Sequence, residues 1–206
     1  MKSIKVLLVL MCCSFANAQE TVTEKAFQKS EAWLLPVVGC PADMMPKVPV
    51  NVDYDKELCR NDINKCLDEC KKDKVAYCYN LAQHIQITKL NNYEKYAEAL
   101  FVKSCRLGSP SGCTNSAATM QHNSDDAVLS CAIRTYSKAC DWNDPWACTM
   151  YGFHLAHGKG IKQDFEKALK VLGKSCKYGS EDPACESATA LTESINKAMG
   201  NHITKD

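Results

Sequence analysis

Apolar and small residues recur at helical spacing through the second half of the chain, most clearly between Cys140 and Cys176. This stretch predicts two short helices, Ala147 to Leu155 and Asp164 to Cys176, joined by a turn at Gly158-Lys159-Gly160. Weaker copies lie on both sides. The first cysteine of each copy recurs after 35, 35 and 36 residues, at Cys70, Cys105, Cys140 and Cys176. A period of this length is typical of helical solenoids, so we expect an all-α, right-handed solenoid of stacked antiparallel helical hairpins.

The same register predicts how the helices pack. Four residues before these cysteines stands a bulky side chain and eight residues before stands an alanine, as in Phe101 with Ala97, Tyr136 with Ala132, and Leu172 with Ala168. An alanine admits a neighbouring helix and the large side chain fills the space beside it. We therefore expect a repeat domain over 55–206, with repeats at about 76–110, 111–145 and 146–181 and a terminal helix over 184–199.

The first residues have the pattern of an export signal. Lys2 and Lys5 precede a short apolar run, and Ala16-Asn17-Ala18 offers a cleavage site before Gln19. The run is too short to span a bilayer. A lipid anchor on Cys12 is not expected, because a small residue should precede the modified cysteine and Met11 stands there. We expect residues 1–18 to be removed and the exported chain to be periplasmic or secreted, with no integral membrane segment.

Residues 19–54 are expected to form an N-terminal helix and a proline-rich extension. The apolar residues of 19–35 fit one amphipathic helix, whereas the four prolines between residues 36 and 52 disfavour a regular helix and favour an extended path. The extension is apolar enough to lie against the first repeat. The alternative is a mobile propeptide.

Fourteen cysteines are unusual for a chain of 206 residues, and export explains them because disulfides persist in oxidising compartments. Four pairs recur with the repeat: Cys70 with Cys78, Cys105 with Cys113, Cys140 with Cys148, and Cys176 with Cys185. Residues eight apart in one helix are roughly 12 Å apart, too far for a disulfide. Each pair must therefore straddle a turn and join one helix to the next. Spacing assigns no partner to Cys40, Cys59, Cys66 and Cys131, which leaves two further bridges or a reactive thiol open.

A metal or redox site is the alternative use of such residues. Cys66 and Cys70 form a C-x3-C, and His154 and His157 form an H-x2-H, but neither belongs to a zinc-site spacing, and the chain has no C-x-x-C. We expect no metal and no cofactor. The formal net charge is +1 and no basic stripe marks a nucleic-acid surface.

Several of these residues carry a family resemblance. The third unit resembles the Sel1-like repeat, a relative of the tetratricopeptide repeat, at Ala147-Cys148, Gly152, Gly158-Lys159-Gly160-Ile161, Asp164, Lys167-Ala168 and Gly179. The cysteine pairs, with Cys78-Tyr79-Asn80-Leu81 and the stretch Tyr136 to Asp141, are similar to the disulfide-stapled subgroup called the Helicobacter cysteine-rich proteins. The likeness covers roughly residues 62–199, although the turns at 86–92 and 121–125 lack the Gly-x-Gly.

The resemblance implies a protein-binding module of the envelope. Such repeats serve as scaffolds, and some periplasmic members act as immunity or adaptor partners of secreted toxins. Other cysteine-rich members are named as penicillin-binding proteins or weak beta-lactamases. A purely structural role in the envelope is a third possibility that the sequence does not separate from partner binding.

A binding surface can be placed on the first helix of each unit. Positions two, six and nine after the second cysteine share one helical face, separate from the core positions. They hold the candidate partner-binding residues Asn80, His84, Asn115, Thr119, His122, Met150, His154 and His157, together with Ile87. The alternative is that these are partly exposed polar side chains with no ligand.

Catalysis is the runner-up. An S-x-x-K occurs at Ser194 to Lys197, in the expected terminal helix, but the S-D-N and K-T-G of serine beta-lactamases are absent from the sequence. No residue is therefore assigned a catalytic role.

Overall fold

The computed structural model describes residues 24–35, 39–88, 93–122 and 125–203, with side chains as far as residue 200. The expected signal segment, 1–18, lies outside these residues. Every regular element in the described part is helical. Residues 24–34 are helical and are followed by α2 (Pro41–Met44), α3 (Ile63–Lys71), α4 (Val75–Thr88), α5 (Glu94–Arg106), α6 (Pro110–Met120), α7 (Asp126–Asp141), α8 (Pro145–His157), α9 (Phe165–Leu172), the 3-10 helix η1 (Gly173–Cys176) and α10 (Pro183–Ile203).

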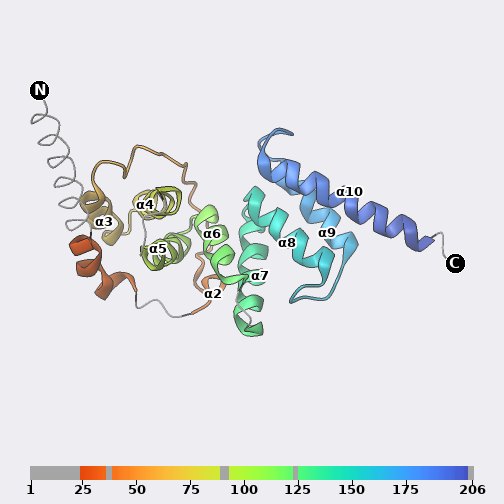
Figure 1. The fold of residues 1–206 in the computed structure, drawn as a ribbon, viewed down its shortest axis with the longest axis horizontal. Helices are drawn as coiled ribbons and strands as arrows, with labels where there is room; N and C mark the ends of the chain where they lie inside the picture. The colour runs from red at the N-terminus through yellow and green to blue at the C-terminus, as the bar shows by residue number, and fades with distance from the viewer. Residues whose placement is uncertain (1–23, 36–38, 89–92, 123–124, 204–206) are drawn as a thin grey trace, which may run out of the picture.

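Each helix from α3 to α9 packs against the next one along the chain. The result is an elongated row with α3 near one end and α10 at the other (Figure 1). The expectation of an all-α protein built from consecutively packed helices is confirmed for the described residues. The terminal helix α10 is longer than expected, since it begins at Pro183 and continues to Ile203.

The turns between units repeat one local structure. The residue three positions after the first cysteine has a positive φ in all four turns: 62° at Asp73, 98° at Gly108, 58° at Asn143 and 102° at Gly179. In the third turn the N–H of Asn143 donates to Cys140 O at 2.9 Å, and the N–H of Asp144 donates to Ala139 O at 3.1 Å. This is the Schellman arrangement that ends a helix at a left-handed residue. Gly, Asn and Asp adopt that conformation at the least cost, which explains their recurrence here.

The next helix begins at once after this turn. Ser109 accepts a hydrogen bond from Gly112 N at 3.0 Å, and the Asp144 carboxylate accepts one from Ala147 N at 2.9 Å. Pro110 and Pro145 follow these caps as the first residues of α6 and α8. Proline suits this position, because its fixed φ is helical and its missing N–H would have no partner inside the helix.

Six disulfides join the twelve cysteines of the described residues. Four of them connect the end of one helix to the start of the next, and these are the pairs that the spacing predicts: Cys70–Cys78, Cys105–Cys113, Cys140–Cys148 and Cys176–Cys185. The other two are Cys40–Cys131 and Cys59–Cys66. The cysteines for which spacing gave no partner thus form two further bridges.

The core follows the expected alternation of bulky and small residues. Phe101, Tyr136 and Leu172 are buried. The alanine four residues before each of them is buried as well. Gly152 shows why the first helices need small residues. A Cβ added there would lie 2.6 Å from Leu172 Cδ2.

The N-terminal extension lies against the first expected repeat, 76–110, through Val50 and Asp53, but it is not extended throughout. Pro41 begins a short helix, α2, because proline is tolerated as a first helical residue. This helix contacts α5, which belongs to the first expected repeat, and it packs mainly on α7, farther along the row.

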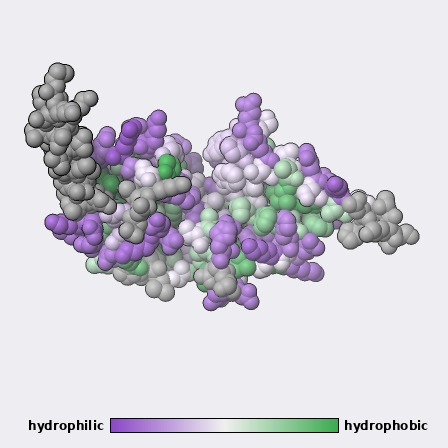
Figure 2. Space-filling model, in the orientation of Figure 1, coloured by the Kyte–Doolittle hydropathy of each residue, from purple (hydrophilic) through white to green (hydrophobic). Residues whose placement is uncertain are grey.

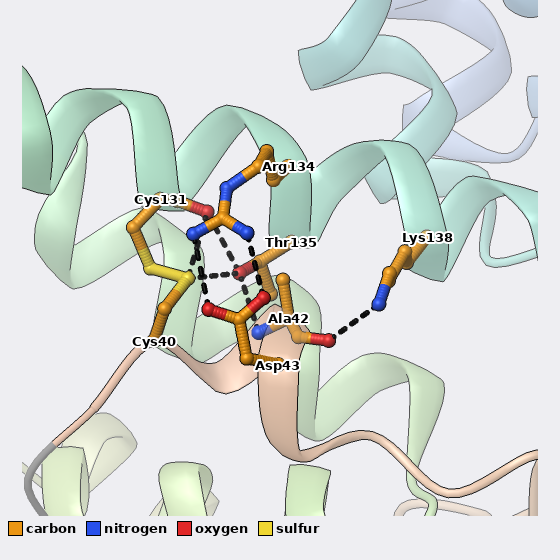
Figure 3. Close-up of polar contacts among 7 residues, drawn as sticks. All are labelled: Cys40, Ala42, Asp43, Cys131, Arg134, Thr135 and Lys138. Carbon is orange, nitrogen blue, oxygen red and sulfur yellow. Dashed lines mark hydrogen bonds and ion pairs between the residues drawn. A yellow bond between two sulfur atoms is a disulfide. The ribbon is translucent and has the colours of Figure 1, made fainter.

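Figure 3 shows how α2 is held on α7. The Cys40–Cys131 disulfide lies beside Thr135, whose Oγ1 accepts a hydrogen bond from Ala42 N at 3.2 Å. The Ala42 carbonyl accepts one from Lys138 Nζ at 2.7 Å. Asp43 completes the anchor as a two-pronged ion pair with Arg134, at 2.6 and 3.1 Å.

From α2 a strap, residues 45–62, crosses the row and leads to α3 (Figure 1). It passes the turn between α5 and α6, where Val50 N donates to Gly108 O at 2.8 Å. On α4 it is held by Asn80, whose Oδ1 accepts from Asp55 N at 2.7 Å and whose Nδ2 donates to Asp53 O at 3.3 Å. The strap therefore connects α7 to α4 by way of the second inter-unit turn.

Candidate binding groove

An open groove crosses the first helices of three successive units, α4, α6 and α8. Its volume is about 430 Å³. The strap adds Tyr54 and α7 adds Tyr136. The full lining is Tyr54, Tyr79, Gln83, Ile87, Ser111, Thr114, Asn115, Ala118, Gln121, Tyr136, Asp144, Trp146 and Met150. Figure 2 shows a notch in the upper outline of the molecule, between the part that carries α4 and the turn that precedes α10.

Helical spacing places these side chains on the groove. On α4, Tyr79, Gln83 and Ile87 follow one another at intervals of four residues, and on α8 Trp146 and Met150 do the same. Residues four apart lie on one face of a helix. The groove is therefore formed by one face of each first helix.

Three large apolar side chains on this surface are exposed to solvent. Tyr54 is 47 % exposed, Ile87 58 % and Trp146 44 %. Scattered exposed apolar residues are ordinary, but a contiguous group of them at a concave site is typical of a binding surface. Trp and Tyr are also the residues most enriched among the energetic centres of protein interfaces.

The one carboxylate of the groove holds two units together. Asp144 accepts hydrogen bonds from Ser111 Oγ and Thr114 Oγ1, both at 2.8 Å, in addition to its bond from Ala147 N. Its oxygens are thus engaged by α6 and by the N-terminus of α8. Asp144 fixes the spacing of the two helices that form the middle of the groove.

Amide side chains supply the remaining polarity. Gln83 Nε2 donates to Tyr79 OH at 2.9 Å, and Asn115 Nδ2 donates to Ser111 O at 2.8 Å. An amide has a second N–H and an oxygen acceptor, so Gln83 and Asn115, with Gln121, can donate to a ligand and accept from it. The lining has no Lys, Arg or His. The groove therefore suits a ligand that carries no negative charge.

Tyr136 forms part of the floor. The side chain is fully buried, and its hydroxyl has no hydrogen-bond partner among the described residues. Burial raises the pKa of this phenol well above its usual value, so it stays protonated and can donate. Phe101 and Leu172 occupy the equivalent positions of the neighbouring units and have no polar group. The hydroxyl is therefore not needed for packing at this position.

A second groove of about 340 Å³ continues from the first. The two share Ser111, Asp144 and Trp146, so the indole of Trp146 stands between them. The second groove is bounded by strap residues 51–53 and by the turn between η1 and α10, which contributes Lys177, Tyr178 and Asp182.

Two of the eight predicted partner-binding residues, Asn115 and Met150, line the first groove, as does Ile87. Two others are buried and are not available to a partner. Asn80 is engaged by the strap, and His154 packs under the turn after α8, with Nδ1 donating to Lys159 O at 2.9 Å. The strap covers Asn80, and the turn after α8 covers His154.

The other four predicted residues lie outside both grooves. Thr119, His122 and His157 are exposed, whereas His84 is half-buried. Burial lowers the pKa of His84, and the charge of Arg60 lowers it further. On α4 the groove is lined by the residues one, five and nine positions after the second cysteine, whereas the prediction used positions two, six and nine. A shift of one residue along a helix turns the side chain by 100°, so positions two and six face away from the groove.

Sequence reasoning missed Trp146, Tyr54 and Tyr136. A signal for Trp146 existed, since it stands in the first turn of its helix, directly after the Asp144-Pro145 cap and away from the core positions. No local signal places Tyr54, because the path of the strap is set by contacts with helices far away in the sequence.

The residues considered for catalysis lie apart from both grooves. Ser194 and Lys197 are exposed on α10 and line neither groove. In the described ranges no three His, Cys, Asp or Glu side chains are grouped as metal ligands would be. Within the same ranges no helix has the length and apolarity to cross a bilayer.

Comparison of the chain with protein-family models, with curated proteins and with solved structures finds no match in any of the three.

Proposed function

We propose that this chain is an exported Sel1-like repeat protein of the disulfide-stapled subgroup, and that it binds a protein partner through the groove across α4, α6 and α8. The recurring turn, with its cysteine pair and left-handed residue, supports the repeat assignment. Six disulfides support export, since such a number is typical of oxidising compartments.

The observation that carries the binding function is the group of exposed apolar side chains in the groove, Tyr54, Ile87 and Trp146. A single helix offers far less surface than the roughly 800 Å² per partner of a typical specific complex. Three first helices and the strap together offer a longer surface. Rigid helices held by disulfides also reduce the conformational entropy that binding costs.

Site-specific photocrosslinking tests this function. Benzoylphenylalanine replaces Ile87, which is exposed on the groove, or His157, which is exposed outside it. Irradiation of cells that export each variant should give one discrete protein adduct from position 87 and none from position 157. Trp146→Ala in the Ile87 variant should remove the adduct.

The matched control for Trp146→Ala is Val48→Ser, which removes an exposed apolar side chain that lines neither groove. This control should leave the adduct unchanged. Equal adducts from positions 87 and 157, or an adduct insensitive to Trp146→Ala, would exclude the groove as the binding surface.

A further inference from the structure

The two grooves form one continuous surface whose ends differ in charge. The first groove has no charged side chain except Asp144, which is engaged by Ser111, Thr114 and the α8 N-terminus. The second groove has three carboxylates, Asp53, Asp144 and Asp182, and one cation, Lys177. Trp146 stands where they meet.

We propose that this surface binds an extended polypeptide segment with two parts: apolar residues that lie in the first groove, and a Lys or Arg that follows and lies in the second. The proposal rests on the proposed function, because it assumes that the groove is the binding surface. It adds the chemistry of the partner and the orientation in which the partner lies.

The first groove determines the apolar part. Ile87, Tyr54 and Met150 offer apolar surface, and the amides of Gln83, Asn115 and Gln121 offer donors and acceptors that match a peptide backbone. An acidic side chain is disfavoured, because the lining offers it no cation.

The second groove determines the cationic part. Asp53 is exposed at its edge, and Asp182 is half-buried at the start of α10, where its Oδ1 accepts from Ala184 N at 2.9 Å. These carboxylates outnumber the one cation of the groove, Lys177, so the groove has a net negative charge. The Lys177 ammonium lies 5.0 Å from the centre of the Tyr178 ring. The exposed faces of Trp146 and Tyr178 also attract a guanidinium or ammonium group. Complementary charge then fixes which end of the segment lies over α10.

The test begins with a displayed library of random dodecapeptides, selected on the oxidised full-length chain. The enriched peptides should share a cluster of apolar or aromatic residues followed by Lys or Arg. One consensus peptide is then titrated by fluorescence anisotropy against four forms of the protein: the wild type, Trp146→Ala, the double variant Asp53→Asn/Asp182→Asn and a charge-matched control.

The control is Asp62→Asn/Asp164→Asn, which removes the same charge from two helix caps outside both grooves. We expect Trp146→Ala to weaken binding by about thirtyfold, as for the central residue of an interface. Asp53→Asn/Asp182→Asn should weaken it by about fivefold and reduce its dependence on salt, because exposed charges are screened. The control should bind as the wild type does.

The outcomes separate the two proposals. Peptides that require Trp146 but show no basic residue, or that bind both double variants equally, overturn the two-part segment and leave the groove as a binding site. A selection without any Trp146-dependent peptide overturns both. The asparagine of Asp182→Asn can still cap α10. Circular dichroism verifies that each variant folds. If the Asp182 variant does not fold, Asp53→Asn compared with Asp62→Asn decides the question.

Discussion

The imidazole of His154 packs beside the phenol of Tyr136, with ring centroids 6.0 Å apart and both side chains buried. Because His154 Nδ1 donates to the Lys159 carbonyl, Nε2 is the unprotonated nitrogen, and it has no partner among the described residues. A proton added to Nε2 would place a positive charge in the core without an acceptor. Burial accordingly lowers the pKa of His154 from its ordinary value of 6.5.

The first prediction concerns the stability of the fold at mildly acidic pH. Below the ordinary pKa of 6.5 the unfolded chain binds a proton at His154 that the folded chain binds only at lower pH. The free energy of unfolding should be fully maintained above pH 6.5 and should fall as the pH decreases below it. His154→Phe should reduce this loss, and His157→Gln, at an exposed position, should not. Urea titrations at one pH above 6.5 and one below it measure the free energy of unfolding of the wild type and both variants. An equal loss of stability in all three proteins would contradict the assignment to His154.

The second prediction concerns the unpartnered hydroxyl of Tyr136. Tyr136→Phe should leave the free energy of unfolding unchanged or raise it by up to about 1 kcal/mol, because a buried hydroxyl without a partner is costly. Tyr96→Phe is the matched control, since its hydroxyl donates to Glu31 Oε1 at 2.5 Å. That change should destabilise the protein by about 1 kcal/mol. Thermal unfolding compares the two variants, and a loss at Tyr136 as large as the loss at Tyr96 would show that the Tyr136 hydroxyl has a partner.

The third prediction concerns the close approach of α8 and α9. Gly152→Ala adds a methyl group where Leu172 lies within 2.6 Å, so it should destabilise the fold. Overpacking of this kind costs about 1–3 kcal/mol. Gly173→Ala adds the same methyl group where no atom lies within 4 Å, and it should be neutral or stabilising. Denaturant titrations compare the free energy of unfolding of the two variants. Equal values would mean that α8 and α9 can move apart without cost.

The fourth prediction concerns the two disulfides outside the repeat pattern. Cys40–Cys131 closes a separation of 91 residues, whereas Cys59–Cys66 closes one of 7. On the loop-entropy model their removal should cost about 4.6 and about 2.5 kcal/mol respectively. Double alanine variants of each pair, unfolded in urea, measure the difference. A smaller loss for Cys40→Ala/Cys131→Ala than for Cys59→Ala/Cys66→Ala would show that α2 contributes little to global stability.

The repeat was predictable from sequence because its determinants are local. The 35-residue recurrence of cysteines fixes which helix ends meet, and the geometry of a disulfide then requires the turn between Cys140 and Cys148. The close approach of α8 to α9 at Gly152 is local in the same way, because Leu172 belongs to the same unit. These features depend only on residues within one unit or its neighbour.

The groove was only partly predictable, because its face depends on distant segments. Asn115 and Met150 were found, but the buried positions of Asn80 and His154 follow from the strap and from the turn after α8. Gly160 in that turn lies so close to α7 that a Cβ would be 2.7 Å from Leu129 Cδ2. The partner of Cys40 was equally hidden, since a bond across 91 residues leaves no trace in local spacing.

If the chain is exported as proposed, the Cys40–Cys131 bridge has a consequence for the order in which its disulfides form. If the twelve bridged cysteines were paired strictly in the order in which they leave a translocation channel, Cys40 would bond to Cys59, and the pairing would stay out of step as far as Cys131. Only Cys140–Cys148 and Cys176–Cys185, which follow Cys131, would then be correct. To reach the native set, Cys40 must stay reduced until residue 131 has emerged, or early bonds must be exchanged by a thiolate. One long bridge thus makes maturation depend either on delayed oxidation of Cys40 or on disulfide exchange, whereas a chain with the short staples alone could be oxidised in simple succession.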